Sequence, residues 1–364
     1  MSFPPGADAA LPFILGAFIA AALIALLVTP AIRVFVRRRG ILDHPSPRRV
    51  NRRPLPRGGG VAVVIAFVVV GGGIAFFGTD IPALQGHRGI QTQQLVGLFG
   101  GAVLAAGIGA LDDAFDLRAR WQFLGQVGLA LVAVLAGISV GFIGNPFGSA
   151  NIPFPYWIGL AFTVVWIVGM INSINFIDGL DGLSSGIAMI AAITLGILSL
   201  TTQVGQPFVA VMCFALAGGL LGFLRWNFYP AVIFQGTAGV MFLGYTLAVL
   251  SILGTAKVVV ALLVLGVPII DSFWVIVRRL SDRRSPFTPD RGHIHHRLLD
   301  LGLSHRATVL LIYGMCATLG LMSLLVSAAT GVYAFLGAIV MFGVLVFLLA
   351  RQARLEPVED EAPT

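Results

Sequence analysis

Long stretches without a charged residue constrain this chain of 364 residues more than any other feature. With Asp, Glu, Lys and Arg counted as interruptions, the stretches are 9–32, 58–79, 89–111, 121–177, 182–224, 226–256 and 307–350. A membrane-spanning helix needs about 20 mostly apolar residues, and a charge at its centre costs roughly 2.5–3.5 kcal/mol. With 57% apolar residues, 11% charged residues and two cysteines, the composition excludes a soluble globular enzyme, a disordered chain and a disulfide scaffold. The chain is predicted to lie in a membrane.

These stretches predict an all-α, polytopic integral membrane protein with about eleven transmembrane helices. The first three stretches hold one span each, and single spans fit at about 238–254 and 258–276. The other three divide in two at GNPFGSANIPFP in 121–177, at TTQVGQP in 182–224 and at SAATG in 307–350. Residues 1–350 are predicted to form one transmembrane domain, and residues 351–364 an acidic, disordered tail.

The positive charges predict the orientation of the spans. All but two of the 23 Lys and Arg residues fall in one alternating set of loops and in the tail; the exceptions are Arg88 and Lys257. Cytoplasmic loops carry such an excess, so the N-terminus is expected outside and the C-terminus in the cytoplasm. Topology and anionic lipid or phosphate account for the net charge of +7, and no nucleic-acid partner is expected. Most aspartates share this face, which indicates a site for metal-bound phosphates.

The first acidic cluster is GALDDAFDLRARWQFLGQ, at the end of the third span. On a helix Asp112 and Asp116 share a face, and Asp113 lies about 100° around it. Three carboxylates so close together need a compensating cation. A divalent metal that bridges a diphosphate is one solution, and a plain helix end paired with Arg118 and Arg120 is the other.

The second cluster, NSINFIDGLDGLSSG, follows the fifth span. Asn172, Asn175, Asp178 and Asp181 recur every three residues, which on a helix or 3₁₀ turn brings their amides and carboxylates to one side. A turn with aspartate caps is the alternative. Because polar groups at a membrane boundary are expensive unless they are used, the spacing favours a functional site.

The third cluster is SPFTPDRGHIHHRLLDLGLS, in the longest cytoplasmic loop. His293, His295 and His296 with Arg291 and Arg297 form a dense group of cations and hydrogen-bond donors. A zinc site is disfavoured, because HIHH lacks the HExxH spacing and no glutamate is near. An anion-binding loop fits better, since arginine binds phosphate in a bidentate manner and histidine adds a switchable charge.

With these motifs the chain resembles the polyprenyl-phosphate N-acetylhexosamine-1-phosphate transferases, and most of all the bacterial branch that makes polyprenyl-diphosphate-N-acetylglucosamine. The matching segments, in the order of the family, are DHPSPRRVNRRPLPRGGG, LDDAFDLRARWQFLGQ, NSINFIDGLDGLSSG, NFYPAVIFQGTAGVMFLG and VPIIDSFWVIVRRLSDRRSPFTPDRGHIHHRL. The resemblance implies transfer of N-acetylhexosamine-1-phosphate from a UDP-sugar to undecaprenyl phosphate, with release of UMP. It also implies a multi-pass protein of the bacterial inner (plasma) membrane that starts a cell-envelope polysaccharide at the cytoplasmic face.

The resemblance further implies the roles of individual residues. Asp112, Asp113, Asp178 and Asp181 are expected to be catalytic, the first two as a pair, and Asn175 to bind Mg²⁺, with Mn²⁺ as a substitute. Substrate-binding roles are expected for Arg57, Asn172, Asp116, His293, His295, His296 and Arg297. The expected partners are a UDP-N-acetylhexosamine, the polyprenyl phosphate lipid and the membrane, and a homodimer is compatible with the sequence.

One departure from the family bears on the metal. The family usually has a metal-binding aspartate in a GDxGS segment, whereas this chain has GTAGV, with Thr237 in place of the carboxylate. One of Asp112, Asp113 or Asp178 is expected to replace it. The departure also motivates an alternative, a catalytically impaired homologue that binds lipid phosphate as a scaffold. A secondary transporter is disfavoured, because the polar groups crowd one face instead of the bilayer midplane.

Overall fold

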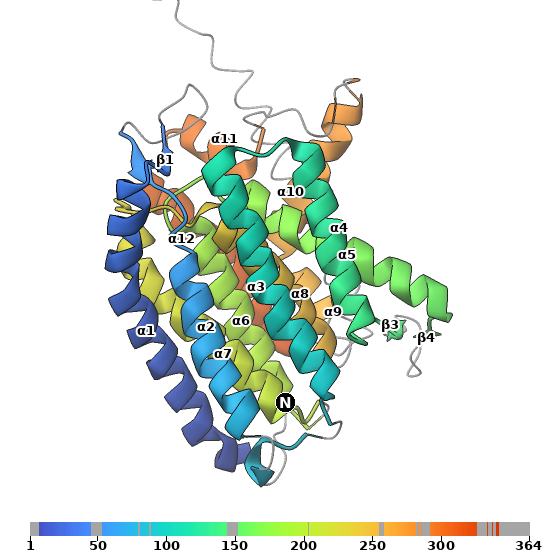
Figure 1. Ribbon diagram of the computed structural model, residues 1–364. Coiled ribbons are helices and arrows are strands. Elements are labelled where there is room, and N and C mark those ends of the chain that lie inside the picture. The colour runs from blue at the N-terminus through green and yellow to red at the C-terminus, as the bar shows by residue number, and fades with distance from the viewer. Residues whose placement is uncertain are drawn as a thin grey trace, which may run out of the picture.

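The helices of the chain lie side by side in one bundle (Figure 1). The computed structural model describes residues 7–44, 53–78, 81–86, 89–143, 152–202, 204–254, 258–281, 283, 285, 292–325, 333, 337 and 340–341. The helices are α1 (Leu11–Arg38), α2 (Val61–Phe77), α3 (Thr92–Phe115), α4 (Ala119–Leu135), α5 (Tyr156–Ile177), α6 (Leu183–Ser199), α7 (Pro207–Asn227), α8 (Gly236–Leu253), α9 (Val258–Val264), α10 (Gly266–Ser281), α11 (Ile294–Asp300) and α12 (His305–Leu325), with 3₁₀ turns η1 (Ala7–Ala10) and η2 (Pro82–Leu84).

Two short antiparallel strand pairs depart from the all-α prediction. β1 (Leu42–Asp43) pairs with β2 (Leu55–Pro56), and β3 (Phe142–Ile143) pairs with β4 (Ile152–Pro153). Each strand has two residues, so the prediction is otherwise correct across the described part of the chain. The β1–β2 pair matters for the site, because it brings the two ends of the first arginine-rich loop together.

The structure supports an integral membrane protein made of helices. In the described residues, six helices are long and apolar enough to cross a membrane: α1 with the preceding turn, α3, α5, α7, α8 and α12. Three shorter apolar helices, α2, α4 and α6, lie among them. The number of eleven spans and the orientation of the termini stay predictions. The span expected after SAATG falls largely outside the described residues, as does the tail 351–364.

The span predicted at 258–276 stays a prediction, and the chain makes two helices there, α9 and α10, with a break at Leu265. Pro268 explains the break: it has no N–H to donate, and its ring clashes with the carbonyl four residues earlier. The second helix carries the buried Asp271, has Arg278 and Arg279 in its last turn and ends at Ser281, before the histidine segment.

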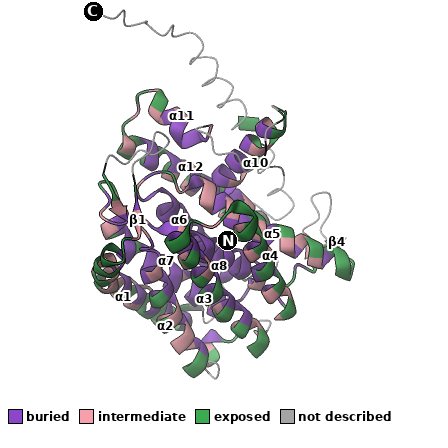
Figure 2. Ribbon diagram, turned by 45° about the horizontal axis from the view of Figure 1, so that its top comes forward, coloured by how far each residue is buried: buried purple, intermediate pink, exposed green. Residues whose placement is uncertain are grey.

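α8 is the central helix of the bundle. It is buried along almost its whole length and packs against α3 and α5 (Figure 2). Close approach to α3 depends on Gly109, where an added Cβ would lie 2.4 Å from the Thr237 carbonyl oxygen. Small residues at such contacts let membrane helices approach each other. This packing sets the acidic end of α3 directly against the start of α8.

The outer faces of the bundle are apolar. Leu15 and Leu27 on α1, Phe77 on α2, Leu135 on α4 and Trp157 on α5 are all more than half exposed. Soluble monomers rarely expose apolar patches of this extent, so these faces are suited to contact with lipid. Figure 1 shows β1, the α3–α4 turn and α11 at one end of the bundle and the N-terminus at the other. The described elements that border three of the loops grouped by the charge pattern thus share one end.

Candidate active site

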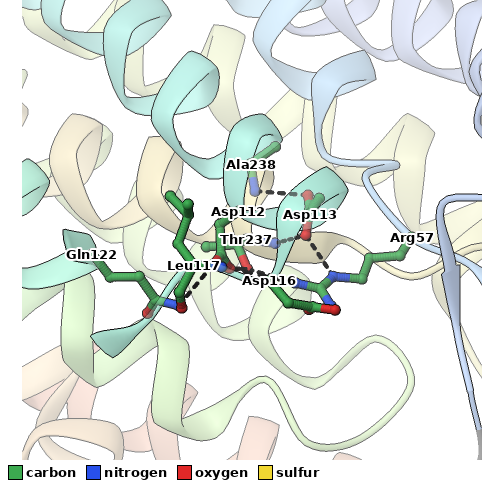
Figure 3. Close-up of polar contacts among 8 residues, drawn as sticks. All are labelled: Arg57, Asp112, Asp113, Asp116, Leu117, Gln122, Thr237 and Ala238. Carbon is green, nitrogen blue, oxygen red and sulfur yellow. Dashed lines mark hydrogen bonds and ion pairs between the residues drawn. The ribbon is translucent and has the colours of Figure 1, made fainter. Parts of the chain in front are cut away.

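Arg57 is the centre of the acidic cluster (Figure 3). Its guanidinium contacts all three aspartates of the first motif: Nε lies 2.6 Å from Asp113 Oδ1, Nη1 3.1 Å from Asp116 Oδ1 and Nη2 3.4 Å from Asp112 Oδ2. The spacing of the aspartates predicted a compensating cation but offered a metal ion or Arg118 and Arg120. In the structure the cation is an arginine more than 50 residues earlier in the chain.

Backbone hydrogen bonds fix the position of Arg57. The amide of Arg57 donates to the carbonyl of Ile41, the amide of Phe234 to Pro56 and the amide of Gly59 to Phe234. The arginine-rich loop is therefore joined to the segment that leads into α8. Because this loop and this segment are anchored to each other, the guanidinium is held between α3 and α8 by more than its own ion pairs.

Asp113 lies between the end of α3 and the start of α8. Its Oδ1 accepts the amide of Thr237 at 2.8 Å and its Oδ2 the amide of Ala238 at 3.1 Å. These amides belong to the first turn of α8, which has no partner within its own helix, and a negative charge is favoured there by the helix dipole. Gly236 precedes them at φ +74, a conformation that favours glycine, and a Cβ there would lie 2.5 Å from Asp113. Asp113 thus caps α8 from another helix.

Asp112 accepts four hydrogen bonds. Its Oδ1 accepts the amide of Leu117 at 2.9 Å and the side chain of Gln122 at 2.7 Å, and its Oδ2 accepts the hydroxyl of Thr237 at 2.6 Å and Arg57. Asp112 and Asp113 are only 3% and 8% exposed. Asp116 differs from them, because it ends α3 in the left-handed region at φ 48 and its side chain is 88% exposed.

A pocket of about 240 Å³ lies beside this cluster. Of the charged residues in the acidic cluster, Arg57 is the one in the described lining of the pocket. Thr237 lines the pocket as well. Asp178 and Asp181 of the second motif line it together with Asn175. The described lining is Asp43, Arg57, Asn175, Asp178, Gly179, Leu180, Asp181, Asn227, Phe234, Gly236, Thr237, Val240 and His296.

The turn between α5 and α6 presents Asp178 to this pocket. The hydroxyl of Ser184 donates to Asp178 Oδ1. Burial is the main cause that raises the pKa of Asp178 to about 6, since this hydrogen bond offsets only part of the cost of its charge. A carboxylate with few donors and a raised pKa is one that a cation would stabilise.

Asp181 is held by the segment before α8 and by the start of α12. Its Oδ2 accepts the amide of Ala231 at 2.9 Å, and its own amide donates to His305 Nε2 at 3.0 Å. The ring of His305 stacks on Tyr229 with centroids 4.4 Å apart. These contacts fix the second Asp-Gly turn against the wall of the pocket.

Asn172 is the predicted site residue of the second motif that does not line this pocket. Its amide donates to Gln126 Oε1 on α4 at 2.6 Å and to the Val168 carbonyl at 2.8 Å. It is therefore outside the described lining of the pocket. Asn175, Asp178 and Asp181 are spaced three residues apart and all line the pocket. Asn172, one helical turn before Asn175, faces α4 instead.

The histidine segment closes the same end of the bundle. Asp271 on α10 accepts His293 Nδ1 at 2.7 Å and the amide of Ile294 at 2.9 Å, so it fixes the start of α11. His295 is buried between the rings of His293 and His296. Burial, followed by the neighbouring histidines, lowers the pKa of His295 well below its ordinary value, so this ring is neutral at pH 7. The switchable charge expected of the segment does not extend to His295.

The remaining residues of this segment differ in whether they line the pocket. His296 lines the pocket, whereas Arg297 Nε donates to the Gly292 carbonyl at 3.2 Å beside it. An added Cβ on Gly179 would meet the ring of His295, so this glycine lets the histidine segment approach the Asp178 turn. Arg291 lies outside the described residues.

The sequence motifs did not predict Asp43 and Asn227, which line the pocket, or Gln235, which bonds to Ser184 and Ser185 of the second motif. Asp43 belongs to the DHPSP segment, whose charge pattern alone is typical of a positive-inside anchor. Asn227 and Gln235 join a buried polar network with Ser185, whose hydroxyl lies 2.9 Å from Asn227 Oδ1 and 2.6 Å from Gln235 Oε1. A signal was available in the serine pair after DGLDGL, because polar side chains inside an apolar helix need partners.

The oxygen donors of the pocket suit Mg²⁺ better than zinc. Within the ranges described, no group of three or more His, Cys, Asp and Glu side chains is placed to hold a metal ion by itself. Mg²⁺ does not require one, because it is commonly bound by one or two carboxylates together with substrate phosphates. Asn175 and Asp178 both belong to the second motif and both line the pocket, and together they form such a donor set.

Comparison with known proteins identifies the family. Residues 95–255 match the family described as glycosyl transferase family 4. The chain is 35% identical over 339 residues to a probable undecaprenyl-phosphate N-acetylglucosaminyl 1-phosphate transferase of Bacillus subtilis, covering 91% of this chain and 89% of that protein. It is 35% identical over 360 residues to the decaprenyl-phosphate N-acetylglucosaminephosphotransferase of Mycobacterium tuberculosis, covering 91% and 88%. An undecaprenyl-phosphate alpha-N-acetylglucosaminyl 1-phosphate transferase of Thermotoga maritima is 29% identical over 282 residues, covering 76% and 78%. The chain therefore belongs to glycosyl transferase family 4, as its motifs predicted.

Proposed function

We propose that the protein transfers N-acetylglucosamine-1-phosphate from UDP-N-acetylglucosamine to undecaprenyl phosphate and releases UMP. The relatives named above act on undecaprenyl or decaprenyl phosphate by their names, which supports the lipid acceptor and the sugar. The reaction takes place at the cytoplasmic face of a bacterial plasma membrane, as the first membrane step of a cell-envelope polysaccharide.

The pocket beside Arg57 is the observation that carries this proposal. Its lining combines a fixed guanidinium with Asn175, Asp178 and Asp181, at one end of a bundle of membrane helices. Arginine neutralises phosphate oxygens, and amide and carboxylate oxygens hold a divalent ion that a diphosphate shares. Exposed apolar side chains at this end, Phe35 on α1, Phe115 on α3 and Trp121 on α4, provide the surface along which a polyprenyl tail lies.

Mg²⁺, or Mn²⁺ in its place, would be held by Asn175 and Asp178. Of the three carboxylates that the sequence offered as a replacement at Thr237, only Asp178 is among the described lining of the pocket. A bound ion would neutralise charge on the diphosphate and orient it for attack. Asp178 and Asn175 would then fix the position of the scissile phosphorus.

The attacking group requires no strong base. A lipid phosphate has a second pKa of about 6, so at neutral pH it is largely dianionic already. Its oxygen forms a bond to the sugar-linked phosphorus, and the bond from this phosphorus to the bridging oxygen of UMP breaks. Phosphoryl transfer of this kind depends mostly on positioning and charge neutralisation, which Arg57 and His296 provide in the pocket.

Asp112 and Asp113 act through Arg57 in this proposal. Both carboxylates are occupied by hydrogen bonds, which disfavours a covalent aspartyl intermediate and direct proton transfer. Their role is to set the position and orientation of the guanidinium. Loss of either aspartate is then expected to reduce turnover by misplacing Arg57.

A scaffold without activity is the alternative that Thr237 motivated, and the names of the relatives give it no support. One assay separates the two: purified protein with UDP-N-acetylglucosamine, undecaprenyl phosphate and Mg²⁺, scored for UMP release and for the mass of the lipid product. Activity above an Asp178→Asn variant is expected. No UMP above that variant would remove the enzyme from consideration, and a product of different mass would correct the sugar.

A further inference from the structure

Asp112 and Asp113 have little capacity left for a metal ion. An ionised carboxylate offers about four acceptor sites. Asp112 uses four of them, two on each oxygen, and Asp113 accepts Arg57, the Thr237 amide and the Ala238 amide. A divalent ion at this pair would have to displace protein donors, including two that cap α8.

Thr237 makes this arrangement self-sufficient. Its hydroxyl donates to Asp112 Oδ2 at 2.6 Å, and Arg57 Nη2 lies 3.4 Å from the same hydroxyl oxygen. A carboxylate at position 237 would have no proton to donate and would place a negative oxygen against Asp112. Such a contact between like charges requires a further cation. The hydroxyl removes that requirement.

Arg57 supplies the remaining positive charge. Its side chain is 14% exposed, and its three carboxylate partners belong to one helix end. A guanidinium keeps its charge and binds in a fixed planar geometry, so it is suited to a permanent position between α3 and α8. It reaches the lining of the pocket, whereas Asp112 and Asp113 are not among the described lining residues.

We infer that Thr237 and Arg57 together replace a divalent cation at the Asp112–Asp113 pair, so that this pair binds no metal ion, and that Thr237 is the positioning residue that permits it. The inference deepens the proposed function, because it limits the metal to the Asn175–Asp178 side and makes Arg57 a fixed cation in the wall of the pocket. It also explains how the site tolerates a hydroxyl where its family usually has a carboxylate.

Metal binding by the full-length protein in lipid nanodiscs tests the inference without any turnover. Mn²⁺ is the probe, measured by electron paramagnetic resonance in the absence of nucleotide. The Asp178→Asn background weakens the proposed ion site of the pocket, whose lining keeps Asp43 and Asp181. An ion that is then lost on Asp113→Asn is one held at the Asp112–Asp113 pair. Thr237→Asp is then compared with Thr237→Asn, which has the same shape without the charge, and with Thr237→Ser, which keeps the hydroxyl.

In this background Thr237→Asp is expected to bind Mn²⁺ about 10–100-fold more tightly than the chain with Thr237, the range that one supporting group contributes at metal sites. In EDTA its Tm falls below that of Thr237→Asn, and Mn²⁺ restores it. Thr237→Asn and Thr237→Ser gain no affinity for Mn²⁺.

Two results would overturn the inference. In the first, the chain with Thr237 binds Mn²⁺ in the Asp178→Asn background and loses it on Asp113→Asn. In the second, Thr237→Asp changes neither Mn²⁺ affinity nor Tm. Binding as expected in a protein that releases no UMP would preserve the inference and refute the proposed function instead.

Discussion

Asp178→Asn is expected to stabilise the metal-free protein at neutral pH, although it removes a residue of the proposed site. Burial raises the pKa of Asp178 from 3.8 to about 6. The folded state therefore holds this proton more tightly than the unfolded state does. Stability is highest below the unfolded pKa and falls as the pH rises from about 4 to about 6, because the carboxylate must then ionise inside the fold.

The magnitude follows from the two pKa values. Each pKa unit corresponds to about 1.4 kcal/mol, so the difference between 3.8 and about 6 amounts to roughly 3 kcal/mol at pH 7, and solvent in the pocket reduces it to about 2 kcal/mol. Asparagine keeps the acceptor for Ser184 and carries no charge. Its advantage over aspartate is expected to grow from near zero at pH 4 to about 2 kcal/mol at pH 7.

The assay is thermal unfolding of detergent-purified protein between pH 5 and pH 8, in EDTA. The matched control is Asp8→Asn, the same chemical change at an exposed position on the N-terminal turn. Asp178→Asn should raise Tm at pH 7–8 and lose roughly a third to a half of that gain at pH 5, whereas the control should show no such dependence. If Asp178→Asn lowers Tm at pH 8, or if its effect does not change with pH, the carboxylate is not a source of strain and the reasoning fails.

Three further predictions concern the packing and the site. Arg57→Lys keeps the charge but loses the planar fork, so UMP release should fall at least about tenfold; unchanged turnover would show that charge alone suffices. Gly109→Ala should lower the stability of the fold by about 1–3 kcal/mol in thermal unfolding, because its Cβ would meet the backbone at the start of α8. Gly107→Ala, in the same helix but with open space around it, is the control and should be neutral or stabilising. Asp271→Asn should raise KM for the UDP-sugar with little change in kcat, since it loosens His293 and the start of α11; an unchanged KM would separate Asp271 from substrate binding.

Much of the architecture could be predicted from the chain because the membrane sets simple requirements. The charge-free stretches located the helices that are long enough to span it, and the distribution of arginine grouped the loops that the structure places at one end of the bundle. The break at Leu265 was missed although Pro268 signals it, because apolar length alone does not distinguish one helix from two. The two short strand pairs contain too few residues for a periodic pattern.

The site was predictable in its residue types but not in its partnerships. The motif correctly grouped Asn175, Asp178 and Asp181, which all line the pocket, although only Asn175 lies on a helix: α5 ends at Ile177, and the two aspartates lie in the turn before α6. Asn172 turned toward Gln126, a residue whose proximity depends on the packing of α5 against α4. Local spacing carries no information about such a neighbour.

The sequence by itself determined a helical membrane protein of glycosyl transferase family 4, with its polar motifs at the ends of spans, because hydropathy and charge act locally along the chain. Only the tertiary structure decided which cation neutralises the aspartates. Arg57 reaches Asp112 and Asp113 because glycine contacts and backbone hydrogen bonds bring the first loop, the end of α3 and the start of α8 together. The meaning of Thr237 followed from the same packing: in the sequence it is a missing carboxylate, and in the fold it is the hydrogen-bond donor that Asp112 requires.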